Sequence, residues 1–260
     1  MQKRSVSQIK EYRACPARYF LCRIEKVWQR PAAWLSQGTA VHAAAEAWEK
    51  SGRTMSLAAV QEVFRRVYAE GINAMAGETP NWNFWFASGP YRGAVDVERR
   101  YGLGLDQADR YLRYYTERAP REVIWIAPDG TPAVELGFEI WLGSVPVRGY
   151  LDQAVIDPRE GLIVRDIKSG NSPGDAFQLA VYAEAIRQVY GQEVHKGDYW
   201  MGKSGKPTLF YDLTEWPATR LVEEFEEVDE LIKAEKFDPT PDEKTCMFCP
   251  VRTSCPIFQA

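Results

Sequence analysis

The spacing of hydrophobic residues predicts helices in the first half of the chain. In residues 56–75, apolar side chains recur three or four positions apart, which places them on one helix face: Leu57, Val60, Val63, Phe64 and Val67. Further helices are predicted over residues 5–16, 37–52 and 106–118. Residues 1–131 are therefore expected to be mainly helical.

From about residue 132 the pattern becomes typical of β-strands. Apolar and polar residues alternate, or β-branched residues cluster, between turn residues. Strands are predicted over residues 133–143, 145–157, 161–170, 194–202 and 207–213, and helices over 172–191 and 217–236. This order predicts an α/β fold with a mixed sheet flanked by helices. A sheet core (132–214) and a C-terminal part (215–260) would complete a single domain, 1–260.

The composition is typical of a folded protein that does not span a membrane. Hydrophobic residues make up 45% of the 260 residues, which is enough for a sizeable core, and no apolar run is long enough to span a bilayer. The N-terminal residues lack the apolar segment of a signal peptide. We therefore expect a cytoplasmic protein with no membrane partner.

Charge is unevenly distributed, although the formal net charge is only -4. Residues 1–30 carry 8 basic and 2 acidic side chains, a balance of +6, whereas residues 215–243 carry 3 basic and 11 acidic ones, a balance of -8. Both segments can be solvated helix faces. Alternatively, the basic segment faces a polyanion. Charge alone does not decide between these interpretations.

The predicted strands over residues 145–157 and 161–170 contain the pattern most indicative of chemistry. Asp166 and Lys168 are separated by one residue, so their side chains point to the same face of the strand. If the two strands pair as an antiparallel hairpin, Asp152 lies beside Asp166. Converging carboxylates repel each other unless a divalent cation such as Mg²⁺ or Mn²⁺ binds between them. This layout suits metal-dependent phosphodiester cleavage, and an ordinary surface Asp–Lys pair is the alternative.

Two helical segments add weaker indications. His42, one of two histidines, lies in an apolar segment, where it is either a core residue or a ligand. Gln178 and Tyr182 are four residues apart, on one face of the helix that follows the Asp-x-Lys strand. These residues gain weight only if a site lies beside them.

Three of the five cysteines are clustered at Cys246, Cys249 and Cys255. In a reducing compartment, clustered cysteines bind a metal more often than they form disulfides. Thiolates bind either zinc or an iron–sulfur cluster, so the cluster alone leaves both open.

The order of these motifs resembles one family of enzymes. An N-terminal S-x-S…CP, then GTAVH, GYLD, DIK, QLAVY and the cysteine cluster resemble the PD-(D/E)xK nuclease superfamily. The resemblance is strongest to its iron–sulfur RecB-like exonucleases, which include the CRISPR-associated four-cysteine exonucleases and the AddB nuclease domain. It spans nearly the whole chain and implies a restriction-endonuclease-like fold that hydrolyses DNA with Mg²⁺ or Mn²⁺.

The resemblance also implies roles for individual residues. The metal ligands would be His42, Asp152, Asp166 and the carbonyl of Ile167, the catalytic lysine would be Lys168, and a supporting motif that contacts DNA would be Gln178 with Tyr182. The second acidic position is often Glu in the family. Asp166 at this position shortens the reach to the metal.

In those relatives four cysteines hold a [4Fe–4S] cluster, which implies Cys15, Cys246, Cys249 and Cys255 as the ligands here. Such a cluster would join the N- and C-terminal segments, and its ligation would contribute folding free energy. A Cys₄ zinc site is the alternative. Cys22 is expected to be a buried small hydrophobic residue, or otherwise to replace Cys15 as a ligand.

The leading hypothesis is a metal-dependent DNA exonuclease that acts on single-stranded ends in DNA recombination, repair or CRISPR adaptation. A second hypothesis is a non-catalytic DNA-end binder, which would not need Asp152, Asp166 and Lys168 together. A third is a zinc-stabilised adaptor for a helicase or integrase partner. The chain has no helicase motif, so any unwinding would come from another protein.

Overall fold

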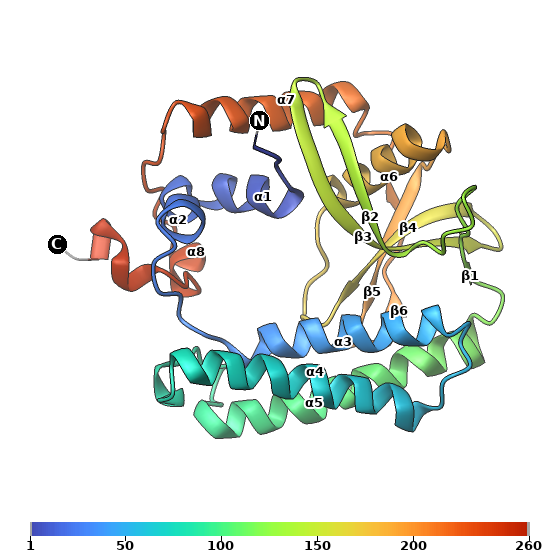
Figure 1. Cartoon of the computed structure of the whole chain (residues 1–260), viewed down its shortest axis with the longest axis horizontal. Coiled ribbons are helices and arrows are strands. Elements are labelled where there is room, and N and C mark those ends of the chain that lie inside the picture. Colours follow the sequence, from blue (N-terminus) through green and yellow to red (C-terminus); the bar gives the residue numbers. More distant parts are fainter. Residues whose placement is uncertain (1, 259–260) are drawn as a thin grey trace. The chain divides into compact units, whose positions relative to one another are not determined.

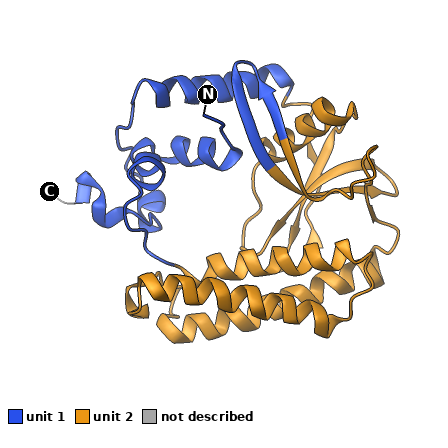
Figure 2. Ribbon diagram, in the orientation of Figure 1, with its two compact units in different colours: residues 1–31, 139–149, 217–260 blue, residues 32–138, 150–216 orange. Residues whose placement is uncertain are grey.

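The computed structural model describes residues 2–258, which divide into two compact units (Figure 2). The first unit contains residues 1–31, 139–149 and 217–260, and the second contains residues 32–138 and 150–216. Two paired strands, β2 (Val134–Leu142) and β3 (Val145–Asp157), have residues in both units. A single domain over residues 1–260 stays a prediction, because compactness does not show whether the units fold independently.

The long helices of the second unit lie around its sheet. They are α3 (Ala33–Lys50), α4 (Leu57–Glu78), α5 (Gly93–Arg113) and α6 (Ala176–Tyr190). Helix α4 begins after Ser56, whose side chain accepts a hydrogen bond from Ala59 N. Val60 and Phe64 of its predicted apolar face are fully buried, and α3, α4 and α5 pack side by side (Figure 1).

Helix α5 corrects one prediction, because it begins at Gly93 and not near residue 106. Gly102 and Gly104 lower the helix propensity of residues 93–105, which the sequence therefore does not predict as helix. A β-carbon at Gly104 would lie only 2.1 Å from Cζ of Phe64. The glycine therefore permits close packing of α4 on α5, and this tertiary contact outweighs its poor propensity.

Within residues 2–258, seven strands form one mixed sheet. Besides β2 and β3, they are β1 (Val123–Ile124), β4 (Gly161–Lys168), β5 (Lys196–Met201), β6 (Lys206–Pro207) and β7 (Tyr211–Asp212). Strand β3 is antiparallel to β1 and β4, β4 is parallel to β5, and β6 and β7 are antiparallel to β5. The mixed α/β fold is confirmed. The strand predicted over residues 207–213 forms only as the two short strands β6 and β7. Between them the Tyr199 N–H donates to the Thr208 hydroxyl at 3.2 Å, where a regular ladder would use a backbone carbonyl.

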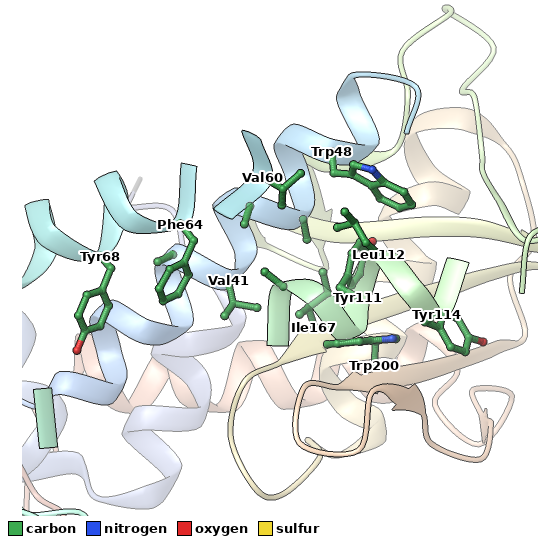
Figure 3. Close-up of a cluster of buried hydrophobic side chains, with 14 of the residues drawn as sticks. Val41, Trp48, Val60, Phe64, Tyr68, Tyr111, Leu112, Tyr114, Ile167 and Trp200 are labelled. Carbon is green, nitrogen blue, oxygen red and sulfur yellow. The ribbon is translucent and has the colours of Figure 1, made fainter. Parts of the chain in front are cut away.

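Different helices cover the two faces of this sheet. Ile167 and Trp200 project into a hydrophobic core shared with α3, α4 and α5 (Figure 3). Helix α6 contacts β4 and β5 and bonds to Asp166. Because side chains alternate along β4, Asp166 and Lys168 face α6 and Ile167 faces the core. The sheet thus separates the core from the predicted catalytic side chains.

The first unit contains α1 (Val6–Ala14), α2 (Pro16–Tyr19), α7 (Ala218–Lys233) and α8 (Glu243–Met247). Helix α1 begins after Ser5, whose hydroxyl accepts from Gln8 N, and α7 confirms the predicted acidic helix. Across the part of the chain that the structure covers, no helix is both long and apolar enough to cross a membrane.

The basic N-terminal segment and the acidic helix α7 pair with each other. Arg4 Nε lies 2.6 Å from Asp229 Oδ1, and both side chains are buried. Arg13 pairs with Glu224, and its Nη2 lies 3.1 Å from Glu227 Oε2. Part of each charge cluster therefore neutralises the other, and the two interpretations stay open for the remaining charges.

Candidate active site

The predicted acidic residues lie where strands β3 and β4 separate. Their antiparallel ladder stops at the pair Gln153 and Arg165. Beyond it, the Ile167 N–H donates to Asp152 Oδ2 at 2.8 Å and not to a β3 carbonyl. The N–H and C=O of one strand residue point to the same side, so the Ile167 carbonyl also faces this gap. The hairpin therefore brings the Asp152 carboxylate to the backbone of Ile167, the residue that follows its predicted neighbour Asp166.

Helix α3 places His42 at the same gap. Its Nε2 lies 2.8 Å from the Ile167 carbonyl oxygen. Its Nδ1 lies 3.4 Å from Glu135 Oε1 and 3.4 Å from Asp152 Oδ2. His42 is therefore grouped with the predicted site residues and is not simply a core residue.

Glu135 joins the candidate site, although its sequence did not predict this. Its φ of 48° lies in the left-handed region, which is unusual for a residue other than glycine. Ligand atoms of His42, Glu135 and Asp152 all lie within 4.8 Å of one another. The local sequence, VELG, alternates like that of any strand, so no pattern signalled that Glu135 would turn towards the site.

The electrostatics of this group favour a bound cation. Burial and the neighbouring Asp166 raise the pKa of Asp152 to about 7. Burial disfavours the protonated His42 ring, but the carboxylates of Asp152 and Glu135 outweigh it and raise the pKa of His42 to about 9. A proton on His42 thus partly compensates the acidic groups. A divalent cation can take over this role, and binding it would release the proton.

Asp166 is held by three of the predicted residues. Lys168 Nζ lies 2.6 Å from Asp166 Oδ2. Gln178 Nε2 donates to Asp166 Oδ1 at 2.5 Å and to the Tyr182 hydroxyl at 2.8 Å. The Tyr182 hydroxyl in turn donates to Asp166 Oδ1 at 3.4 Å. The strand period and the four-residue helix spacing therefore place these side chains together, as predicted.

The role of Asp166 as a metal ligand stays a prediction. It is not one of the three groups that converge within 4.8 Å. Its Oδ2 is buried, and among the described residues it accepts no hydrogen bond of standard geometry, although Lys168 lies beside it. A lone pair on this oxygen thus remains for a metal ion, which fits the predicted ligand set.

The opposite face of β4 carries a buried ionic network. Arg165 is 1% exposed, and its Nε and Nη2 donate to Asp198 at 2.6 and 2.7 Å. Its Nη1 donates to Glu122 at 2.5 Å and to the Tyr115 hydroxyl at 2.8 Å. Arg165 immediately precedes Asp166, so this network ties β4 to β5 directly behind the site.

In the first unit, one pocket is lined by all the cysteines of the predicted cluster: Cys15, Cys246, Cys249 and Cys255. Most other lining residues are apolar, and the guanidinium of Arg18 can offset thiolate charge. Cys22 is buried but does not line the pocket. Burial and the nearby Glu11 raise the pKa of the Cys22 thiol to about 12, so it stays protonated. The pocket thus contains Cys15 and the three C-terminal cysteines but not Cys22.

Comparison with known proteins adds an independent observation. The family model described as "PD-(D/E)XK nuclease superfamily" matches residues 3–256. The chain belongs to this superfamily. It is also similar to the Gene 69 protein of Mycobacterium phage D29, with 51% identity over 264 residues, 98% of this chain and 97% of the relative. The Gene 69 protein of Mycobacterium phage L5 is 47% identical over 283 residues, with the same coverage.

Membership of the PD-(D/E)XK superfamily agrees with the mixed α/β sheet and confirms the predicted family. PD-(D/E)XK nucleases usually use divalent metals, and His42, Glu135 and Asp152 form a candidate metal site. The match identifies the superfamily, and membership of its RecB-like iron–sulfur branch stays a prediction.

Replacing Glu135 by Gln is expected to weaken Mn²⁺ binding by about 10- to 100-fold, since the amide keeps the size of the side chain but removes its charge. Isothermal titration calorimetry measures this affinity. Glu139→Gln is the matched control, because Glu139 lies on the same strand but is exposed and pairs with Lys3. Equal affinities for wild type and Glu135→Gln would remove Glu135 from the site.

Proposed function

We propose that this protein hydrolyses phosphodiester bonds of DNA with a divalent metal bound at the gap between β3 and β4. The observation that carries the proposal is the convergence of His42, Glu135 and Asp152 within 4.8 Å. Lys168 lies on the adjoining strand, paired with Asp166. A binding protein for DNA ends would not need acidic groups beside a phosphate, since they repel it unless a cation is present.

The proposed metal ligands are the predicted ones together with Glu135. The proposed set of His42, Glu135, Asp152, Asp166 and the Ile167 carbonyl would hold Mg²⁺ or Mn²⁺, both of which favour oxygen ligands. When bound, such an ion polarises the phosphate and lowers the pKa of a water molecule. Binding of the ion would be coupled to loss of the proton that His42 carries.

The remaining residues would stabilise charge on the phosphate and position the Asp166 carboxylate. The ammonium of Lys168 would stabilise negative charge that develops on the phosphate, or orient the attacking water. Gln178 and Tyr182 hold the Asp166 carboxylate from helix α6, so its second oxygen stays directed at the site. Their predicted contact with DNA is part of this proposal.

We also propose exonuclease action on single-stranded ends. End-labelled linear and closed circular single-stranded DNA, each incubated with Mn²⁺, Mg²⁺ or EDTA, test this. Metal-dependent loss of the linear strand alone supports an exonuclease, and cutting of the circle makes the enzyme an endonuclease. A role in DNA recombination or repair stays a prediction. CRISPR adaptation and a helicase or integrase partner stay predictions.

The cysteine pocket supports a structural [4Fe–4S] cluster bound by Cys15, Cys246, Cys249 and Cys255. Four thiols in one pocket match the ligand number of such a cluster. Burial raises the pKa of the Cys249 thiol, and ionised thiolates at Cys15 and Cys255 would raise it further. A bound metal would therefore be needed to keep all four thiols deprotonated. A Cys₄ zinc site has the same requirement.

Cys249→Ser is expected to lose the bound metal and to unfold at a lower temperature, by about 2–4 °C for each kcal/mol of ligation energy that is lost. Cys22→Ala should keep its metal, since Cys22 lies outside the pocket lining. Iron, sulfide and zinc analysis with visible absorbance distinguishes a cluster from zinc. Full metal content in Cys249→Ser would exclude this thiol as a ligand.

A further inference from the structure

An exposed tyrosine stands beside the site carboxylates. Tyr150 precedes Asp152 by two residues in β3, so both side chains project from the same side of the strand, roughly 6–7 Å apart. Asp152 is 8% exposed, whereas Tyr150 is 67% exposed. Along this side of β3, Tyr150 is thus the side chain nearest to Asp152 that is open to solvent.

Strand β2 supports the ring of Tyr150. A β-carbon at Gly137 would lie 3.2 Å from Cε1, 3.5 Å from Cδ1 and 3.9 Å from Cζ of Tyr150. Gly137 follows Glu135 by two residues. Tyr150 is thus two residues from Asp152 in β3, and Gly137, on which its ring packs, is two residues from Glu135 in β2. A side chain at position 137 would push the ring away from this position.

The fold does not account for the exposure of Tyr150. Among the described residues, none forms a hydrogen bond with its hydroxyl and no other aromatic ring packs against it. Tyr182, in contrast, is buried and bonded to Gln178 and Asp166. An aromatic ring that is supported on one side and open to solvent offers a stacking surface for a planar group, and nucleobases stack on such rings irrespective of sequence.

We propose that Tyr150 stacks on an unpaired nucleobase of the DNA strand whose phosphate lies at the metal site. This inference rests on the proposed function and gives a structural reason for a single-strand preference. A base is joined to its phosphate through one sugar, so a phosphate beside Asp152 brings its base within reach of Tyr150. In a duplex the same base is paired and stacked, and it must first leave the stack.

Two oligonucleotides with identical backbones test the stacking role. One is a thymidine strand, and the other carries an abasic residue at each of the same positions. Fluorescence anisotropy in Ca²⁺ measures binding without relying on cleavage, and end-labelled strands in Mn²⁺ measure cleavage. The variants are Tyr150→Ala, Tyr150→Phe and Phe84→Ala. Phe84 is a matched control, because it is a 63% exposed aromatic residue of the same unit, in the separate short 3-10 helix Trp82–Phe84.

Tyr150→Ala should weaken binding of the thymidine strand by about 5- to 150-fold and leave binding of the abasic strand unchanged. Tyr150→Phe and Phe84→Ala should both keep the preference of the wild type for the thymidine strand. An equal loss on both strands, or no loss on either, would overturn the stacking role. A protein that loses this preference in Tyr150→Ala but cleaves neither strand would contradict the nuclease function and support the stacking.

Discussion

Lys168→Ala is expected to lower the rate of DNA cleavage by about 10²- to 10³-fold, the usual effect of removing one group that stabilises transition-state charge. The Lys168 ammonium lies 2.6 Å from Asp166 Oδ2 and its side chain is 29% exposed, so it can reach both the carboxylate and a bound phosphate. Because it acts on developing charge, its loss should reduce kcat more than it raises KM. Single-turnover cleavage of a labelled strand measures the effect.

The control for this variant is Lys196→Ala on the neighbouring strand. Lys196 is also a partly exposed lysine in an ion pair, here with Glu160. The Lys196→Ala variant should cleave DNA at the wild-type rate. Thermal unfolding of Lys168→Ala should remain cooperative, since Gln178 and Tyr182 still hold Asp166. Cleavage within a few-fold of wild type would exclude Lys168 as a catalytic residue.

Arg165→Met is expected to lower the free energy of unfolding by about 3–5 kcal/mol, the second large effect. The variant removes the buried Arg165 guanidinium. The carboxylates of Asp198 and Glu122 then lack their cationic partner. Burial already raises the pKa of Asp198, so the unpaired carboxyl should take up a proton at the cost of stability. Urea unfolding followed by circular dichroism measures the loss.

Arg113→Met provides the comparison for Arg165. Arg113 also pairs with an aspartate, Asp109, but its side chain is 64% exposed. An exposed pair of this kind contributes at most about 0.5 kcal/mol. If the two variants lost similar amounts of stability, the network behind β4 would not stabilise the sheet.

The spacing of residues in the sequence was enough to predict much of the candidate site. A period of two in a strand put Asp166 and Lys168 on one face, and a hairpin put Asp152 beside them. The four-residue spacing put Gln178 and Tyr182 on one side of α6. These relations depend on local geometry, so a single sequence reveals them. His42 could be included only through the resemblance to a family, because its helix reaches the site through tertiary packing.

The features that were missed depend on contacts between distant segments. Glu135 turns towards the site through a backbone conformation that its sequence does not favour. Gly104 would break a helix on propensity alone, yet it is needed for contact with Phe64. The pairing of Arg13 with Glu224 joins segments about two hundred residues apart, so each charge cluster on its own gave no indication of it.

The most direct test of the metal-dependent active site is the Mn²⁺ dependence of DNA cleavage by wild type and Asp152→Asn. Asp152 is central because it bonds to Ile167 N and lies beside His42. The wild type should cleave with a saturable dependence on Mn²⁺, lose activity in EDTA and regain it with excess Mn²⁺. Folded Asp152→Asn should not cleave at any of these concentrations. Cleavage that persists in EDTA, or that is unchanged in Asp152→Asn, would contradict this assignment of the site.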